Sequence, residues 1–136
     1  MTQLVRDAMV SEPLALPASA PATEAGEALA RPDVRAVFVC DEGVLLGVVT
    51  RKTLVREVVA AGRDPRTTPV GSIAEQPNAT LESTMPLTDA FNFLEERDYE
   101  RVPVVEEGKL VGVLSRAVVQ RRLAEDEPPL APEHVV

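Results

Sequence analysis

The side chains that could carry out a reaction are few in this chain of 136 residues. The single histidine, His134, lies in the acidic, proline-rich stretch EDEPPLAPEHVV, and the single cysteine, Cys40, lies in the apolar run AVFVC. Glu106 and Glu107 form a carboxylate pair of the kind used in acid–base catalysis, but Gly108 follows them in a stretch that favours a hairpin turn. We therefore expect both glutamates to face solvent and Cys40 to be a buried small apolar residue.

No Cys/His pair, metal-spaced cluster or phosphate-cradling loop accompanies these residues in the sequence. The sequence therefore predicts a protein that is not an enzyme. We expect no catalytic residue, no metal site and no required cofactor.

The most informative feature is a stretch that occurs twice. GVLLGVVTR spans residues 43–51 and GKLVGVLSR spans residues 108–116, and both end in a hydroxyl residue followed by arginine. A shift of 65 residues aligns the chain with itself without a gap, and 16 of the 54 pairs from Val5 to Val58 are identical. Duplication at a fixed offset indicates one supersecondary unit used twice.

Each copy has the same predicted elements. A short extended piece leads to Pro21 or Pro86, and proline is favoured at the first position of a helix. After this helix come two β-branched runs joined by a short loop with glycine, which predicts a hairpin. A closing helix then begins at Thr50 or Ser115, both natural N-cap residues.

The predicted fold class is α+β, with two tandem β-α-β-β-α repeats packed about a pseudo-two-fold axis and small sheets covered by helices. We place the first repeat at residues 1–64, the interrepeat linker at 65–69 and the second repeat at 70–123. Residues 124–136 form an acidic, proline-rich tail that is expected to be disordered.

Composition restricts the partners and the compartment. The formal charge of -8 argues against nucleic acid, because clustered Lys and Arg drive binding to a phosphate backbone. No apolar run approaches the roughly 20 residues that span a bilayer, and the N-terminus MTQLVRDAM lacks the plan of a signal peptide. A single cysteine agrees with a reducing compartment. We expect a cytoplasmic protein with no nucleic-acid partner and no membrane partner.

A family resemblance follows from the order of these motifs. VRDAM, a P-x-T-E-A helix start, a valine-rich strand and GVVTR together resemble a CBS domain, and the two copies resemble the tandem CBS pair, or Bateman module, of stand-alone two-repeat proteins. The resemblance covers residues 4–123. It implies a regulatory module that senses an adenosine-containing ligand such as AMP, ADP or ATP in a cleft between the repeats. It also implies a flat homodimer and an unidentified protein partner that receives the signal.

The resemblance assigns the apolar part of this cleft to the valine-rich strands. Val37 and Phe38 in the first copy, and Arg101, Val102 and Pro103 in the second, would lie against the adenine or beside it. Phe38 stands where the second copy has proline, and its ring would fill part of the first slot. The choice between the two halves of the cleft stays open.

The resemblance assigns the polar part to the repeated stretch. The hydroxyls of Thr50 and Ser115 would meet phosphate and ribose, and Arg51 and Arg116 would add charge-assisted contacts to phosphate. All four also have structural explanations: the hydroxyls as helix N-caps, and the arginines as part of a solvated face.

Two positions depart from the family pattern. The carboxylate that the family places three residues after each hydroxyl is replaced by Thr53 and Val118. Their loss favours the alternative function, a ligand-free protein-interaction or dimerisation module that has lost nucleotide binding. Dimerisation is expected in either case, because the first helix, ATEAGEALA, is poor in large apolar residues whereas the second has several, so the repeats offer unlike surfaces. These large residues are Leu87, Phe91, Phe93 and Leu94.

Overall fold

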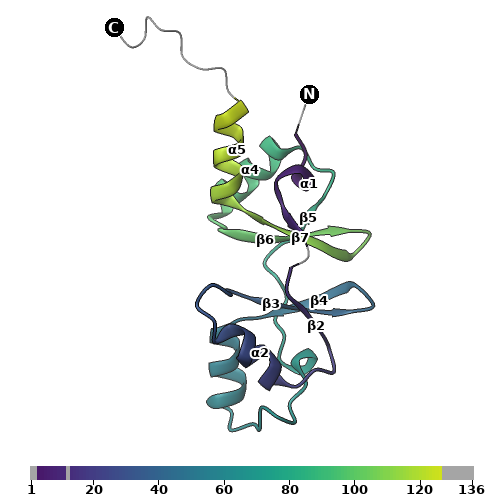
Figure 1. The fold of residues 1–136 in the computed structure, drawn as a ribbon, viewed down its shortest axis with the longest axis vertical. Coiled ribbons are helices and arrows are strands. Elements are labelled where there is room, and N and C mark those ends of the chain that lie inside the picture. The colour runs from purple at the N-terminus through teal and green to yellow at the C-terminus, as the bar shows by residue number, and fades with distance from the viewer. Residues whose placement is uncertain (1–2, 12, 127–136) are drawn as a thin grey trace, which may run out of the picture.

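The computed structural model describes residues 3–11 and 13–126 (Figure 1). The first half contains α1 (Val5–Ala8), β1 (Val10–Ser11), β2 (Ala15–Pro17), α2 (Ala22–Leu29), β3 (Val37–Asp41), β4 (Val44–Val49), α3 (Arg51–Leu54) and the π-helical turn η1 (Val55–Val59). The second half contains the 3-10 turn η2 (Val70–Ser72), β5 (Leu81–Glu82), α4 (Leu87–Arg97), β6 (Arg101–Glu106), β7 (Lys109–Ser115) and α5 (Arg116–Asp126). Residues 124–126 of the predicted tail thus belong to α5, and residues 127–136 lie outside the described part.

The strands confirm the predicted α+β architecture of two repeats. Their order is β2-β3-β4-β7-β6-β5, and in each repeat a short strand pairs in parallel with the first strand of an antiparallel hairpin. In Figure 1 the helices α2 and α3 lie on one side of this assembly and α1, α4 and α5 on the other. The interior of the molecule therefore contains the surfaces on which the two repeats face each other.

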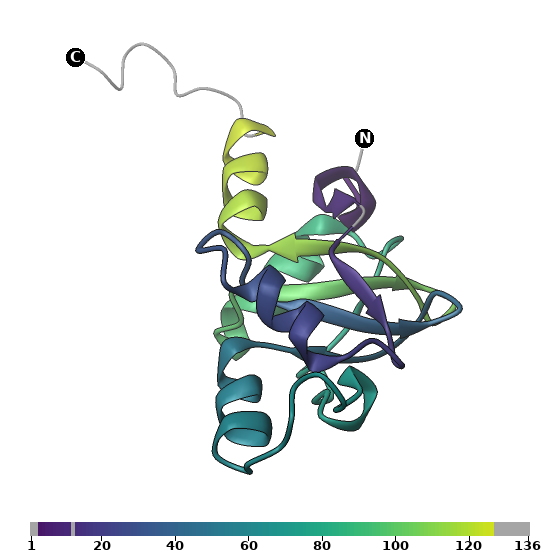
Figure 2. The same ribbon diagram turned by 60° about the horizontal axis from the view of Figure 1, so that its bottom comes forward.

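The two hairpins point the same way and meet at their tips (Figures 1 and 2). One residue pair, Val44 with Lys109, joins β4 to β7. The backbone N–H groups of Leu45 and Leu110 donate to the carbonyls of Gly108 and Gly43 at 3.1 and 2.9 Å. The sheets of the two repeats are thus connected at one end by very few hydrogen bonds.

The hairpin turns follow from their sequences. Glu42 and Gly43 have φ values of 50° and 84°, and Glu107 and Gly108 have 50° and 80°. Positive φ at both central residues is the pattern of a two-residue hairpin loop, and glycine at the second position adopts it without steric cost. Glu106 and Glu107 are exposed, as predicted.

The helices begin within one residue of the predicted positions. Pro21 and Pro86 are the N-caps of α2 and α4, so these helices begin one residue later than expected, at Ala22 and Leu87. Thr50 is the N-cap of α3, as predicted, and α5 begins directly after Ser115. Among the described residues no helix combines the length and apolar character needed to cross a bilayer.

The segments that precede the two sheets are exchanged between the repeats. Residues 3–11 precede the first sheet in the chain but pack on the second repeat, where the Val5 N–H donates to the Met85 carbonyl at 2.9 Å and β1 pairs with β7. Residues 68–75 pack on the first repeat, where the Val70 N–H donates to the Ala20 carbonyl at 2.8 Å. Each repeat is therefore completed by a segment that adjoins the other repeat in sequence.

Each repeat has its own hydrophobic core, and the exchanged segments contribute to both. The second-repeat core consists of Val5, Ala8, Leu81, Leu87, Ala90, Leu94, Val102, Val104, Leu114 and Val119. The first-repeat core consists of Ala20, Ala22, Ala25, Leu29, Val37, Val39, Val49, Val58, Val70 and Ile73.

The large apolar residues on which the dimerisation argument rested belong to the second-repeat core. Leu87 and Leu94 are only 1% and 0% exposed. Phe91 and Phe93 are partly buried against the same core. The assignment of Leu87 and Leu94 to an outer surface was therefore wrong, because they belong to the core, whereas Phe91 and Phe93 keep part of their side chains exposed.

Gly47 and Gly112 occupy equivalent positions in β4 and β7, where an exchanged segment passes close by. A Cβ atom at Gly47 would lie 2.9 Å from the Glu75 carbonyl oxygen, and one at Gly112 would lie 2.8 Å from the Val10 carbonyl oxygen. These distances are too short for any side chain. Glycine is thus required at both positions because the backbone of the exchanged segment approaches so closely.

Candidate functional site

A cavity of about 580 Å³ lies between the two repeats. Its walls are formed by strands of both hairpins and by the two segments through which the chain crosses from one repeat to the other. Most of its lining is apolar and includes Val10, Leu14, Phe38, Val48, Pro77, Ala79, Val102, Pro103 and Val113. The polar side chains in its wall are Asp33, Arg35, Thr50, Asn78, Arg101 and Ser115.

Six of the residues predicted to bind a ligand line this cavity. The first repeat contributes Phe38 from β3 and Thr50 from the end of β4, and the second repeat contributes residues from β6 and the end of β7. Phe38 is only 7% exposed, so its ring forms a packed wall. The six residues are Phe38, Thr50, Arg101, Val102, Pro103 and Ser115.

The other predicted residues do not line the cavity. Val37 is 0% exposed within the first-repeat core, and Val118 is half-buried on α5. Thr53, Arg51 and Arg116 contact other parts of the protein, as described next.

Thr53 is fully buried and hydrogen-bonded to Thr50. The Thr50 N–H donates to Thr53 Oγ1 at 3.0 Å, and the Thr53 N–H donates to Thr50 Oγ1 at 3.3 Å. The two hydroxyl oxygens are 3.1 Å apart. This reciprocal pattern is a capping box, which satisfies N–H groups at the start of a helix. The Thr53 hydroxyl is thus used within the helix start, and the Thr50 hydroxyl is partly used there.

Both predicted phosphate-binding arginines have partners within the protein. Arg51 Nη2 donates to the Arg31 carbonyl at 2.8 Å, just beyond the end of α2. Arg116 donates to Asp98 at 3.0 Å and also forms a short ion pair with Glu100. The hydrogen bond to Asp98, followed by the charge of Glu100, raises the pKa of Arg116. In this structure neither guanidinium faces the cavity.

Four consecutive residues of the cavity wall were not predicted. Asp33, Val34, Arg35 and Ala36 lie in the loop before β3. The shift of 65 residues places Arg35 opposite Glu100, so a reversal of charge between the copies was visible in the sequence. That reversal was the signal that this loop differs between the two repeats.

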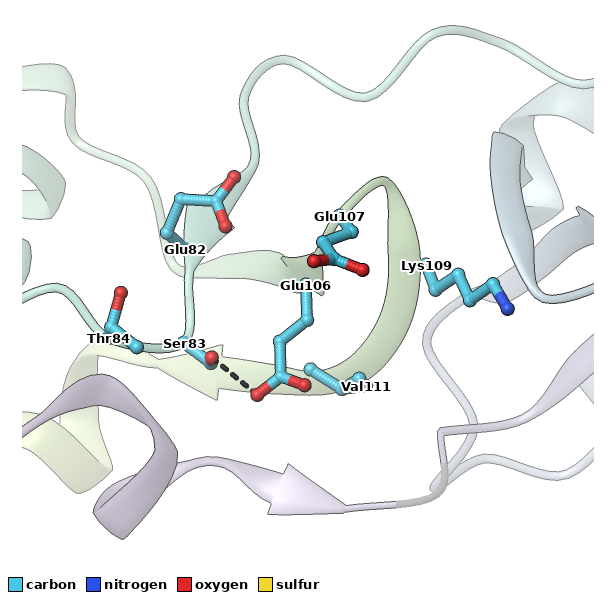
Figure 3. Close-up of a pocket in the computed structure, with 7 residues that line it drawn as sticks. All are labelled: Glu82, Ser83, Thr84, Glu106, Glu107, Lys109 and Val111. Atoms are coloured by element: carbon cyan, nitrogen blue, oxygen red, sulfur yellow. Dashed lines mark hydrogen bonds between the residues drawn. The ribbon is translucent and has the colours of Figure 1, made fainter.

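Glu106, Glu107 and Cys40 do not line this cavity. Figure 3 shows a second cavity, of about 450 Å³, beside the second hairpin, where Glu106 accepts a hydrogen bond from Ser83 at 2.6 Å and Lys109 points away from the carboxylates. Cys40 is half-buried rather than buried, and burial raises the pKa of its thiol. His134 lies outside the described residues. Within residues 3–11 and 13–126 no group of three or more His, Cys, Asp or Glu side chains is placed to hold a metal ion.

Comparison with known proteins gives a match over both repeats. The CBS domain family model matches residues 5–60 and again residues 70–125. Hypoxic response protein 1 of Mycobacterium tuberculosis is 32% identical over 104 residues, which cover 76% of this chain and 73% of that protein. The relationship therefore extends over nearly the whole described chain.

Solved structures agree with this relationship. The crystal structure of Hypoxic Response Protein I with two coordinated zinc ions has a TM-score of 0.75 at 27% identity and covers 88% of this chain and 98% of that one. The crystal structure of CBSX2 in complex with AMP has a TM-score of 0.68 at 25% identity, covering 90% of this chain and 96% of that one.

Proposed function

This chain belongs to the CBS domain family, with two such domains in tandem, and from this premise we propose that it is a non-catalytic regulatory module. It senses an adenosine-containing ligand, such as AMP, ADP or ATP, in the cavity between its repeats. It passes the resulting change in their arrangement to a protein partner. The reducing cytoplasm is the compartment that we propose, on the basis of its single cysteine, Cys40.

The observation that carries this proposal is the composition of the cavity. Its volume of about 580 Å³ lies in the range of small-molecule sites, and such sites are largely apolar with a few polar groups. Phe38 and Pro103, from opposite repeats, offer apolar surface to a flat base. Ser115 stands at the N-terminus of α5, an 11-residue helix, and helix N-termini favour anionic groups. The CBSX2 complex with AMP supports the same ligand class.

A ligand in this cavity contacts both repeats and can therefore change their relative angle. The ligand shifts the equilibrium between two arrangements of the repeats only to the extent that it binds one arrangement more tightly than the other. The hairpin tips, where Val44 pairs with Lys109, hold the sheets together by few hydrogen bonds. We therefore place the pivot of the movement at these tips.

Thermal denaturation with AMP, ADP, ATP, S-adenosylmethionine, NAD and no ligand tests this function. A ligand that binds only the folded state adds about 2.7 kcal/mol at 100 times its dissociation constant, which raises the Tm by several degrees. We expect one of these compounds to do so, and Ser115→Ala to reduce the shift in a folded protein. The matched control is Ser19→Ala, which changes an exposed serine that does not line the cavity. No shift with any of them at millimolar concentration would contradict nucleotide sensing.

The alternative is a ligand-free protein-interaction or dimerisation module. It is favoured by the fact that the Thr53 hydroxyl is engaged by Thr50, while the Val118 side chain offers no hydrogen bond. A buried ribose hydroxyl left without a partner would cost about 1 to 3 kcal/mol. In this reading the cavity wall is simply the packing surface between the two repeats.

Homodimerisation is proposed for either function. Val55 and Val59, one helical turn apart in η1, are 58% and 73% exposed, and such paired apolar side chains favour burial against a second copy. We expect a dimer by sedimentation velocity at micromolar concentration, and a monomer after Val55→Glu with Val59→Glu. The matched control is Lys52→Glu with Arg56→Glu, which changes exposed residues of the same helical segment. A monomeric wild-type protein at high micromolar concentration would contradict this proposal.

A further inference from the structure

The cavity is asymmetric although the sequence is duplicated. Several equivalent pairs line it together, such as Phe38 with Pro103 and Thr50 with Ser115. The loops before the hairpins differ, because residues 33–35 line the cavity whereas their counterparts, residues 98–100, do not. The first-repeat end of the cavity is thus bordered by a loop that has no counterpart at the second-repeat end.

Ion pairs explain why the loop of residues 98–100 does not line the cavity. Arg116 binds Asp98 at 3.0 Å and also binds Glu100, and its own side chain is only 20% exposed. Tyr99, between these two acids, packs edge-on against Phe93, with ring centroids 6.0 Å apart. Asp98 and Glu100 are therefore held beside the start of α5, and Tyr99 is held against α4.

The first repeat has only part of this cluster, because Asp33 is identical to its counterpart Asp98 but one other charge is reversed. Arg35 occupies the position equivalent to Glu100, and Arg51 occupies the position equivalent to Arg116. Two guanidinium groups do not form an ion pair, so Arg51 binds the Arg31 carbonyl instead, and Asp33 pairs with Arg31 at 3.2 Å. Arg35 has no ion pair with any of the described residues, and it borders the cavity.

We propose that the cavity holds one anionic nucleotide per chain and that Arg35 binds its charged group at the first-repeat end. The charges at positions 35 and 100 determine at which end of the cavity this group binds. This inference rests on the proposed function. An unpaired guanidinium in a chain of net charge -8 is a suitable partner for phosphate, and charge-assisted hydrogen bonds are the stronger ones. The pairing of Arg116 with Asp98 and Glu100 keeps the Arg116 guanidinium out of the cavity at the second-repeat end, where Arg101 is the cation in the wall.

The inference is tested by exchanging the charges of Arg35 and Glu100. AMP binding to each variant is measured by calorimetric titration. Wild-type protein is expected to bind one AMP per chain. Arg35→Glu places a carboxylate where it can pair with Arg51, as Glu100 does with Arg116, and is expected to weaken AMP binding about tenfold or more. Glu100→Arg added to Arg35→Glu frees Arg116 from one partner, supplies a cation at the second end and is expected to restore binding of one AMP.

Glu27→Arg is the matched control, because it changes the net charge as Glu100→Arg does at an exposed residue that does not line the cavity. It is expected to leave AMP binding unchanged. Thermal denaturation of each variant establishes that it is folded. Two AMP molecules per wild-type chain, or wild-type affinity in the folded Arg35→Glu variant, would overturn this inference and leave the proposed function intact. Absence of AMP binding to wild-type protein, together with no binding of the other adenosine compounds, would overturn both.

Discussion

Replacement of Val5 by aspartate is expected to unfold the second repeat, although Val5 adjoins the first repeat in sequence. Val5 is 0% exposed and packs in the core that contains Leu94 and Leu114. A carboxylate in that core has no partner, and burial of an unpaired charge is among the mechanisms that cost more than about 4 kcal/mol. Urea denaturation measures the loss of stability, and hydrogen exchange locates it.

Arg6→Asp is the matched control, because it introduces the same residue at the neighbouring, exposed position. We expect Arg6→Asp to change stability by less than about 1 kcal/mol. In the Val5→Asp protein, strands β6 and β7 are expected to lose protection before β3 and β4. Loss of protection in the first repeat instead, or equal stability of the two variants, would show that residues 3–11 do not complete the second core.

Replacement of Gly112 by valine is expected to have the second largest effect. The new Cβ would lie 2.6 Å from Met9 Sδ and 2.8 Å from the Val10 carbonyl oxygen. The methionine side chain can move, but the carbonyl belongs to the backbone of β1, which pairs with β7. We expect a loss of about 3 kcal/mol or more, the upper part of the usual range for overpacking, measured by urea denaturation.

Gly26→Ala is the control for the loss of glycine itself. Gly26 lies within α2, and a Cβ there would meet only the Leu54 side chain, at 3.9 Å. Alanine is a better helix former than glycine, so this change should stabilise the protein by about 0.5 to 1 kcal/mol. A Gly112→Val protein as stable as wild type would mean that β1 does not lie against β7.

Much of the fold could be predicted because its signals are either repeated along the chain or local. The gapless duplication indicated two equal units, the glutamate–glycine turns indicated the hairpins, and Thr50 indicated the start of α3. The exchange of segments could not be predicted in the same way. Val5 and Val70 are identical residues in equivalent segments, so the hydrophobic pattern suits either core equally and does not indicate which core each segment joins.

The site was predicted less well, because its geometry depends on partners that are distant in sequence. Arg116 follows Ser115 as Arg51 follows Thr50, and nothing near either arginine indicates its partner. Asp98 precedes Arg116 by 18 residues, and Arg31 precedes Arg51 by 20 residues. The apolar strand residues Phe38 and Pro103 were assigned through the family resemblance, which pointed to the strands as a whole. Because neighbouring residues of a strand face opposite sides, Val37 beside Phe38 lies in the core instead.

The most direct test of the account is a crystal structure of the protein grown with millimolar AMP. We predict one AMP per chain in the cavity between the repeats, with its base between Phe38 and Pro103 and its phosphate at Arg35. A cavity that stays unoccupied at saturating AMP, and also in crystals grown with ADP or ATP, or a nucleotide bound only outside this cavity, would contradict the central claim that the space between the repeats is a nucleotide site.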